Sequence, residues 1–231
     1  MEDNITAVQE QAIMFAYLEP VPTMVPQIVY HPFFDFTTYC VQDPKSGKVK
    51  SFDITNAEEL KAAREIIVSI IKQCDTVQHI VWLIRKAYRL TFIKYIDKYL
   101  SSETFSKILA DAYIHSENPN RDKNVSVSVL KKWFHKADKK FLMNEKEYQK
   151  YCNLPDQITV YRGIRENGKT NGLSWTTDYE QAVWFSKRFS HCDKADGKVL
   201  VATISKEHVF ACFDGRGENE IICQPHKFTY V

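Results

Sequence analysis

Three short polar elements in the last third of the chain combine residue types that could do chemistry: an arginine, small hydroxyls and a pair of carboxylates. Arg162 precedes Gly163 at the end of a β-prone run, and a guanidinium makes paired, charge-assisted hydrogen bonds to phosphate oxygens. Ser174 begins a short Ser-Trp-Thr run, where its hydroxyl can orient a neighbouring group. Glu218 and Glu220 follow a glycine turn. On a strand, two carboxylates at this spacing project from one face, where they can stabilise developing positive charge.

Each of these elements alone also has an ordinary structural interpretation. An arginine at the end of a strand is most often a surface cation, and a run of Ser and Thr suits any strand. A Glu-x-Glu pair is usually one solvated face of a strand. The order, spacing and contexts of the three elements together favour a functional site over these separate interpretations.

Together the three elements resemble the mono-ADP-ribosyltransferases of the Arg-Ser-Glu type, a family that includes many bacterial toxins and phage enzymes. The resemblance covers about residues 157–225 and rests on three runs: Val160-Tyr161-Arg162-Gly163, Gly172-Leu173-Ser174-Trp175-Thr176 and Gly217-Glu218-Asn219-Glu220-Ile221-Ile222. The chain departs from the family at Trp175-Thr176, where Thr-Ser is more usual, and it keeps the leading serine.

The resemblance implies an enzyme that transfers ADP-ribose from NAD to a protein acceptor and releases nicotinamide. Arg162 would bind the pyrophosphate of NAD, and Ser174 would orient the nicotinamide ribose and the catalytic carboxylate. Glu220 matches the catalytic glutamate, placed beside the oxocarbenium-like centre that forms as the nicotinamide–ribose bond breaks. Glu218 matches the acid that assists the acceptor in arginine-modifying members, so an arginine acceptor is favoured.

The same resemblance assigns supporting residues around these groups. Four further residues are expected to contribute to NAD binding: Gly163, Thr176, Phe185 and Arg188. Residues 210–217 would form the acceptor-recognition loop, with Phe213 and Arg216 in contact with the substrate, although Phe213 equally suits a hydrophobic core. Residues 191–197 would lie beside the phosphates and the nicotinamide.

Two other functions stay open from the sequence. The same fold could modify nucleic acid or act mainly as an NAD glycohydrolase, or it could be a binding module without catalysis. The intact Arg, Ser and Glu argue against the binding module. Glu218 argues against nucleic acid, because a glutamine at this position often accompanies nucleic-acid, Asn or Cys acceptors.

A zinc site and a basic docking surface are the main alternatives elsewhere. Four residues are spaced like the ligands of a zinc ion: His208, Cys212, Cys223 and His226. Cysteines in strands can equally serve as small buried hydrophobic residues. No metal is expected, and NAD is the expected co-substrate. Residues 121–150 hold nine Lys/Arg and four Asp/Glu, which form either a solvated helix face or a docking surface for an acidic protein or RNA.

Composition favours a cytoplasmic protein with no membrane partner. The net charge of +2 among 231 residues sets no strong field toward nucleic acid or membrane. The longest apolar run, residues 80–84, is far shorter than the roughly 20 residues that a spanning helix needs. Residues 1–4 lack the basic start of a signal peptide, and six scattered cysteines without a Cys-x-x-Cys pair indicate reduced thiols.

An α+β fold is expected, with an N-terminal helical lobe packed on a mixed, mainly antiparallel sheet of the ADP-ribosyltransferase type. Six of the seven glycines follow residue 160, which predicts turn-rich sheet there and helix before it. The expected parts are an extension over 1–55 with a helix and a hairpin, a helical lobe over 56–153 and a catalytic sheet over 154–231, the last two as one folding unit.

Local patterns predict the individual elements. Helices are expected over residues 1–18, 76–100, 102–115 and 130–141. Two further helices are expected to start at capping boxes, one formed by Asn56 and Glu59 and one by Thr177 and Glu180. A hairpin is expected over residues 36–41 and 48–54, and strands over 158–161, 173–176, 199–204, 209–213, 220–223 and 228–231.

Overall fold

In a computed structural model, the chain is divided into two units, Met1–Glu117 and Asn118–Val231. The structure describes residues 2–43, 47–117, 119, 122–188, 197–215 and 217–231. This division differs from the expected boundaries after residues 55 and 153. The reason is packing across both positions: the N-terminal hairpin packs against the helix that follows it, and the helices before residue 153 pack against a strand of the C-terminal sheet.

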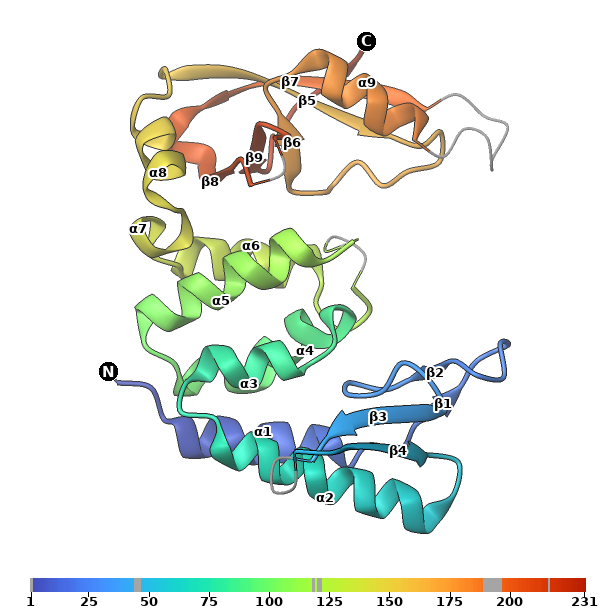
Figure 1. The fold of residues 1–231 in the computed structure, drawn as a ribbon. Coiled ribbons are helices and arrows are strands. Elements are labelled where there is room, and N and C mark those ends of the chain that lie inside the picture. The colour runs from blue at the N-terminus through green and yellow to red at the C-terminus, as the bar shows by residue number, and fades with distance from the viewer. Residues whose placement is uncertain (1, 44–46, 118, 120–121, 189–196, 216) are drawn as a thin grey trace. The chain divides into compact units, whose positions relative to one another are not determined.

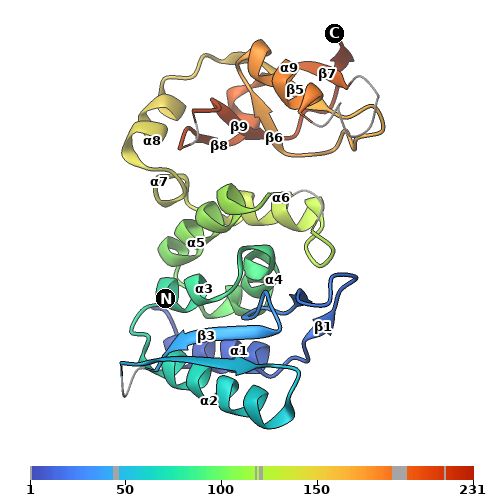
Figure 2. The same cartoon turned by 45° about the vertical axis from the view of Figure 1, so that its right-hand side comes forward.

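The first unit is a group of helices with a small hairpin beside them (Figures 1 and 2). Its helices are α1 (Ile5–Ala16), α2 (Ala57–Gln73), α3 (Val77–Leu83), α4 (Lys86–Ile96), η1 (Asp97–Tyr99) and α5 (Ser102–His115). Its strands form two antiparallel pairs, β1 (Val21–Pro22) with β2 (Val29–Tyr30) and β3 (Thr38–Gln42) with β4 (Val49–Asp53). The second pair confirms the predicted hairpin. No described helix has the length and apolarity needed to cross a membrane.

Both ends of α2 are held by side chains. Asn56 accepts hydrogen bonds from the backbone N–H groups of Glu58 and Glu59, as expected of an N-cap. The reciprocal half of the predicted capping box is wrong, because the carboxylate of Glu59 accepts from the N–H of Asp53 at 2.7 Å. The acid therefore ties the helix to the end of the hairpin.

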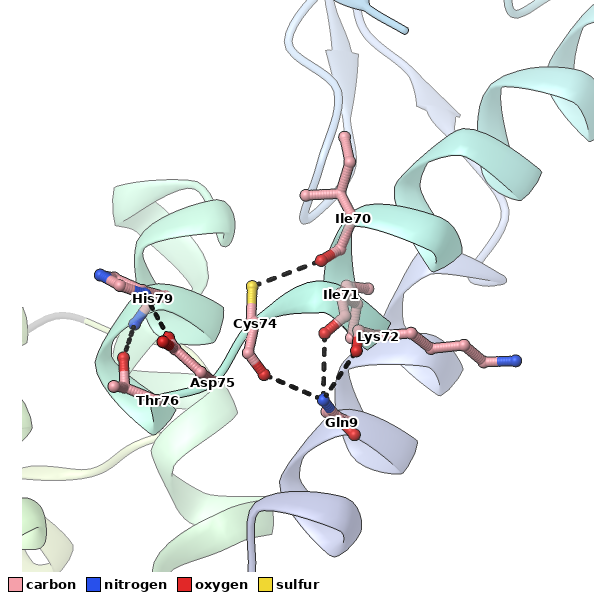
Figure 3. Close-up of polar contacts among 8 residues, drawn as sticks. All are labelled: Gln9, Ile70, Ile71, Lys72, Cys74, Asp75, Thr76 and His79. Carbon is pink, nitrogen blue, oxygen red and sulfur yellow. Dashed lines mark hydrogen bonds and ion pairs between the residues drawn. The ribbon is translucent and has the colours of Figure 1, made fainter. Parts of the chain in front are cut away.

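Gln9 of α1 occupies the opposite end of α2 (Figure 3). Its amide nitrogen lies 3.3, 3.4 and 3.1 Å from the carbonyl oxygens of Ile71, Lys72 and Cys74. The last carbonyls of a helix have no partner within it, so an amide from a neighbouring helix satisfies groups that would otherwise need water. Gln9 thus fastens α1 to the end of α2.

Two helices that the apolar periodicity predicts as continuous are broken. The segment expected over 76–100 ends as α3 and restarts as α4, with the N–H of Arg85 bonded to the carbonyl of Pro32 at 2.8 Å. The segment expected over 130–141 is α6 (Val127–Lys136) followed by α7 (Lys139–Leu142), where Asp138 caps the second helix. In both places the apolar stripe continues while the backbone turns.

His31 is a buried residue of the first unit, only 1% exposed. Its Nδ1 accepts a hydrogen bond from the N–H of Phe33 at 3.0 Å, so its Nε2 carries the proton and donates to the carbonyl of Leu18 at 3.0 Å. The ring also stacks on Phe34 with centroids 4.4 Å apart. Burial is the main cause that lowers the pKa of His31 from 6.5 to about 4.

The first unit should therefore lose stability in mild acid. The folded state holds His31 neutral, so this contribution is complete above the unfolded pKa of 6.5 and is lost as the pH falls toward 4. The loss should amount to roughly 3 kcal/mol in the free energy of unfolding. Urea titrations at pH 7 and pH 4.5 measure it, with His31→Gln as the non-titrating control. Equal pH dependence in both proteins would contradict the expectation.

The second unit contains a six-stranded sheet whose neighbouring strands are all antiparallel. The order is β10-β7-β5-β6-β9-β8, with the strands β5 (Gln157–Ile164), β6 (Ser174–Thr176), β7 (Lys198–Ser205), β8 (Val209–Phe213), β9 (Glu220–Cys223) and β10 (Thr229–Tyr230). Helix α9 (Tyr179–Lys187) packs on β5 and β7 (Figure 1). Helices α6, α7 and α8 (Glu145–Cys152) pack at β8. Helix and antiparallel sheet together confirm the expected α+β class.

Candidate functional site

The strands that carry the three predicted elements are neighbours in the sheet. Tyr161 of β5 pairs with Thr176 of β6, and Thr176 pairs with Glu220 of β9. Elements far apart in the sequence thus form one row across the sheet. This order brings the Arg162, Ser174 and Glu220 segments side by side.

Ser174 and Glu220 share one face of the sheet. The register pairs Ser174 with Ile222 and Thr176 with Glu220, so Ser174 and Glu220 are diagonal neighbours on adjacent strands. Such neighbours lie about 7–8 Å apart, which a long side chain can span. Both residues are half-buried. A hydroxyl and a carboxylate therefore project together beside the start of β9.

The side chain of Arg162 contacts the backbone of Ser174. By the two-residue period of a strand, its side chain leaves the sheet on the face opposite that of Tyr161, Thr176 and Glu220. The guanidinium nevertheless reaches β6, where Nη1 donates to the carbonyl oxygen of Ser174. A Cβ at Gly172 would lie 2.1 Å from Nη2, so the glycine makes room for this arrangement. The Arg162 guanidinium thus contacts the Ser174 backbone, but the two side chains leave the sheet on opposite faces.

The hydroxyl of Thr176 links two parts of the site. The residue is 5% exposed. Its Oγ1 donates to the carbonyl oxygen of Glu218 at 2.9 Å and accepts from the N–H of Asp178 at 3.0 Å. Asp178 in turn caps α9 through Gln181, in place of the predicted Thr177–Glu180 capping box. Thr176 therefore joins the segment before β9 to the start of α9.

Glu218 lies in the turn before β9 and not on the strand. The strand begins at Glu220, and Asn219 between the two glutamates has a left-handed φ of +47°. The strand alternation that was expected to place both carboxylates on one face therefore does not apply to Glu218. The residue is half-buried, and its carbonyl is held by Thr176.

Helix α8 supports this turn through two contacts that were not among the predicted features. The Glu147 carboxylate accepts from the N–H of Asp214 at 2.8 Å and, in a capping box, from the N–H of Asn144 at 3.0 Å. One helical turn further on, Lys150 Nζ donates to Asn219 Oδ1 at 2.6 Å. The Asn-x-x-Glu spacing could have revealed the capping box. No local signal reveals the contact between Lys150 and Asn219.

The basic run before the sheet is partly engaged within the unit. Besides Lys150, Lys139 donates to the hydroxyl of Tyr151 at 2.6 Å and to the carbonyl of Val209 at 3.0 Å. These two lysines hold helices to strands or turns. They are therefore not part of a freely solvated basic face.

Gly163 serves the packing of α9 on β5. A Cβ at this position would lie 2.0 Å from the carbonyl oxygen of Ala182 and 2.6 Å from the backbone nitrogen of Ser186. Backbone atoms of a packed helix cannot move aside as the tip of a side chain can. The close contact between α9 and β5 thus explains a glycine at this position without reference to its expected role in NAD binding.

Replacing Gly163 with alanine should destabilise the second unit by about 1–3 kcal/mol, because overpacking forces the backbone to shift. Gly215→Ala is the matched control, since a Cβ there meets nothing within 4 Å. Urea unfolding of both variants measures the difference. Equal unfolding midpoints would contradict the prediction, because they would show that α9 can shift without lowering the free energy of unfolding.

The remaining predicted site residues have different outcomes. Phe213 is 3% exposed in a fully buried strand, as its core alternative predicts. Phe185 is half-buried and its ring lies edge-on to Trp184, with centroids 5.0 Å apart. Arg188 is exposed, with its guanidinium 5.3 Å from the centre of the Trp184 ring. Arg216 and residues 191–196 lie outside the described residues.

The four residues with zinc-like spacing do not gather. His208 and His226 have ring centroids 5.8 Å apart. Cys212 and Cys223 are buried, and burial raises the pKa of the Cys212 thiol to about 12. Burial also raises the pKa of the Cys223 thiol. In the part of the chain that the structure describes, no three His, Cys, Asp or Glu side chains are placed to hold a metal ion.

The Ser174 hydroxyl and the Glu220 carboxylate lie on one face of adjacent strands, whereas the Arg162 guanidinium starts from the other face and contacts the Ser174 carbonyl. A guanidinium can bind an anion, and a carboxylate can stabilise positive charge. The chain matches no family model, and comparisons with curated proteins and with solved structures give no match.

Proposed function

We propose that this protein transfers ADP-ribose from NAD to a protein acceptor, with arginine the favoured acceptor residue, and releases nicotinamide. The observation that supports this most is the adjacency of β5, β6 and β9, with the Arg162 guanidinium on the Ser174 backbone. A motif resemblance spread along the sequence would carry little weight if its parts lay in distant strands. Here the parts are neighbours.

In this proposal each group has one task. Arg162 binds the pyrophosphate of NAD through charge-assisted hydrogen bonds, and the carbonyl of Ser174 fixes the guanidinium relative to β6. Such prior positioning lowers the cost of orienting the group when the substrate binds. The hydroxyl of Ser174 orients the catalytic carboxylate and the nicotinamide ribose.

The carboxylate of Glu220 stabilises the positive charge that develops on the nicotinamide ribose. The bond between the nicotinamide nitrogen and the ribose carbon breaks, and its electron pair leaves with nicotinamide. The ribose then carries oxocarbenium-like charge, which a nearby carboxylate stabilises electrostatically. An acceptor guanidinium nitrogen forms the new bond to this carbon, and Glu218 takes the proton that it releases.

The purified chain, NAD labelled in its adenylate half and a cell lysate test the proposal. Label should appear in the protein fraction while nicotinamide is released. Label in the nucleic-acid fraction would show that the acceptor is nucleic acid and not protein. Nicotinamide release without label in either fraction would indicate a glycohydrolase. A chain that produces neither would overturn the proposal in favour of a binding module.

A further inference from the structure

The two glutamates of the site are held in position by different means. Glu220 is part of the strand ladder, paired with Thr176 on one side and with Phe213 on the other. Glu218 precedes the ladder and follows a turn that begins at Asp214. Thr176 holds its carbonyl, and its position also depends on what holds that turn.

Helix α8 supplies a cation to this turn. Lys150 Nζ lies 2.6 Å from Asn219 Oδ1 and 3.9 Å from Asp214 Oδ2, so one ammonium bridges both ends of the turn. The N–H of Asn219 also points back to Asp214 Oδ1 at 3.4 Å. Asn219 sits at a positive φ, where its backbone sets the direction of the chain between the glutamates.

We infer that Lys150 is a positioning residue that fixes Glu218 through Asn219 and so favours transfer to an acceptor over transfer to water. This inference rests on the proposed function. Without the ammonium, the turn loses its bridge while the ladder around Glu220 stays intact. Proton removal from an acceptor needs Glu218 in place, whereas the ribosyl charge needs only Glu220.

Lys150→Met should therefore lower ADP-ribose transfer by about tenfold to a hundredfold, the cost of misplacing a reacting group. Nicotinamide release should fall much less. Lys150→Arg keeps a donor and should restore much of the transfer. Lys146→Met is the matched control, because Lys146 is an exposed lysine of the same helix.

A double-mutant cycle tests the route through Asn219. Asn219→Gly removes the amide and suits the left-handed backbone. In that background Lys150→Met should add little further loss of transfer. Full additivity of the two losses would overturn the route through Asn219.

Amide hydrogen exchange over residues 214–220 separates failure of this inference from failure of the proposed function. Lys150→Met should speed exchange in this segment relative to Lys146→Met, whether or not the protein acts on NAD. If the unaltered protein neither releases nicotinamide nor labels a protein, the proposed function fails. Unchanged exchange overturns the positioning role, and so does an equal fall in transfer and nicotinamide release in an active protein.

Discussion

Replacing Glu220 with glutamine is expected to slow nicotinamide release about 10²- to 10³-fold, the usual cost of removing one electrostatic contact to a transition state. The amide keeps the shape of the side chain and removes its charge. Affinity for NAD should change little, because the positive charge on the ribose develops only as the bond breaks. Steady-state rates of nicotinamide release, together with NAD titration by calorimetry, separate the two effects.

The control for this variant is an acid of the same unit that lies outside the site. Glu207 has a side chain that is 77% exposed in the short helix between β7 and β8. Glu207→Gln makes the same chemical change without touching the sheet ladder, so it should release nicotinamide at the unaltered rate. Unchanged turnover in Glu220→Gln would remove Glu220 from the mechanism.

Those parts of the fold that depend on local patterns could be predicted from the sequence. The predicted hairpin appears as β3 paired with β4, and the helix predicted over 102–115 appears as α5. The strands of the second unit also lie close to their expected positions. Apolar periodicity and turn residues act over a few positions, so one segment carries enough information to specify each element.

Two of the failed predictions involve a partner that lies outside the predicted element. Periodicity continues through Arg85, but the backbone there bonds to Pro32. Glu59 stands at capping-box distance from Asn56, but its carboxylate bonds to the N–H of Asp53 instead. In each case a contact from outside the segment competes with the local preference, and a local pattern carries no information about it.

The candidate site divides in the same way. Residue types and order indicated Arg162, Ser174 and Glu220, but the strand register that sets the side-chain faces is a property of the assembled sheet. The turn before β9 is another example. A strand that started earlier would place Glu218 beside Glu220, but the left-handed Asn219 ends that alternation. Lys150 reaches the turn from a helix many residues earlier.

Replacing Glu218 with glutamine is expected to lower ADP-ribose transfer to arginine by about 10²-fold or more, the contribution typical of a general base. Hydrolysis of NAD should survive, because water needs less activation and Glu220 still stabilises the ribosyl charge. The position of Glu218 outside the ladder of β9 supports this separation, since its loss leaves the pairing of Glu220 with Thr176 intact. Its carbonyl contact to Thr176 involves the backbone and is kept in the variant.

Parallel assays of nicotinamide release and of label transferred to protein decide the role of Glu218. An acceptor-specific role predicts that transfer falls while nicotinamide release persists, so that NAD is consumed without labelling. A solvated carboxylate in the turn predicts that neither falls. A carboxylate that only supports the fold predicts that both fall together, with a lower unfolding midpoint in urea. Because the glutamine is isosteric and the backbone contact is kept, we expect the midpoint to stay unchanged and the two activities to separate.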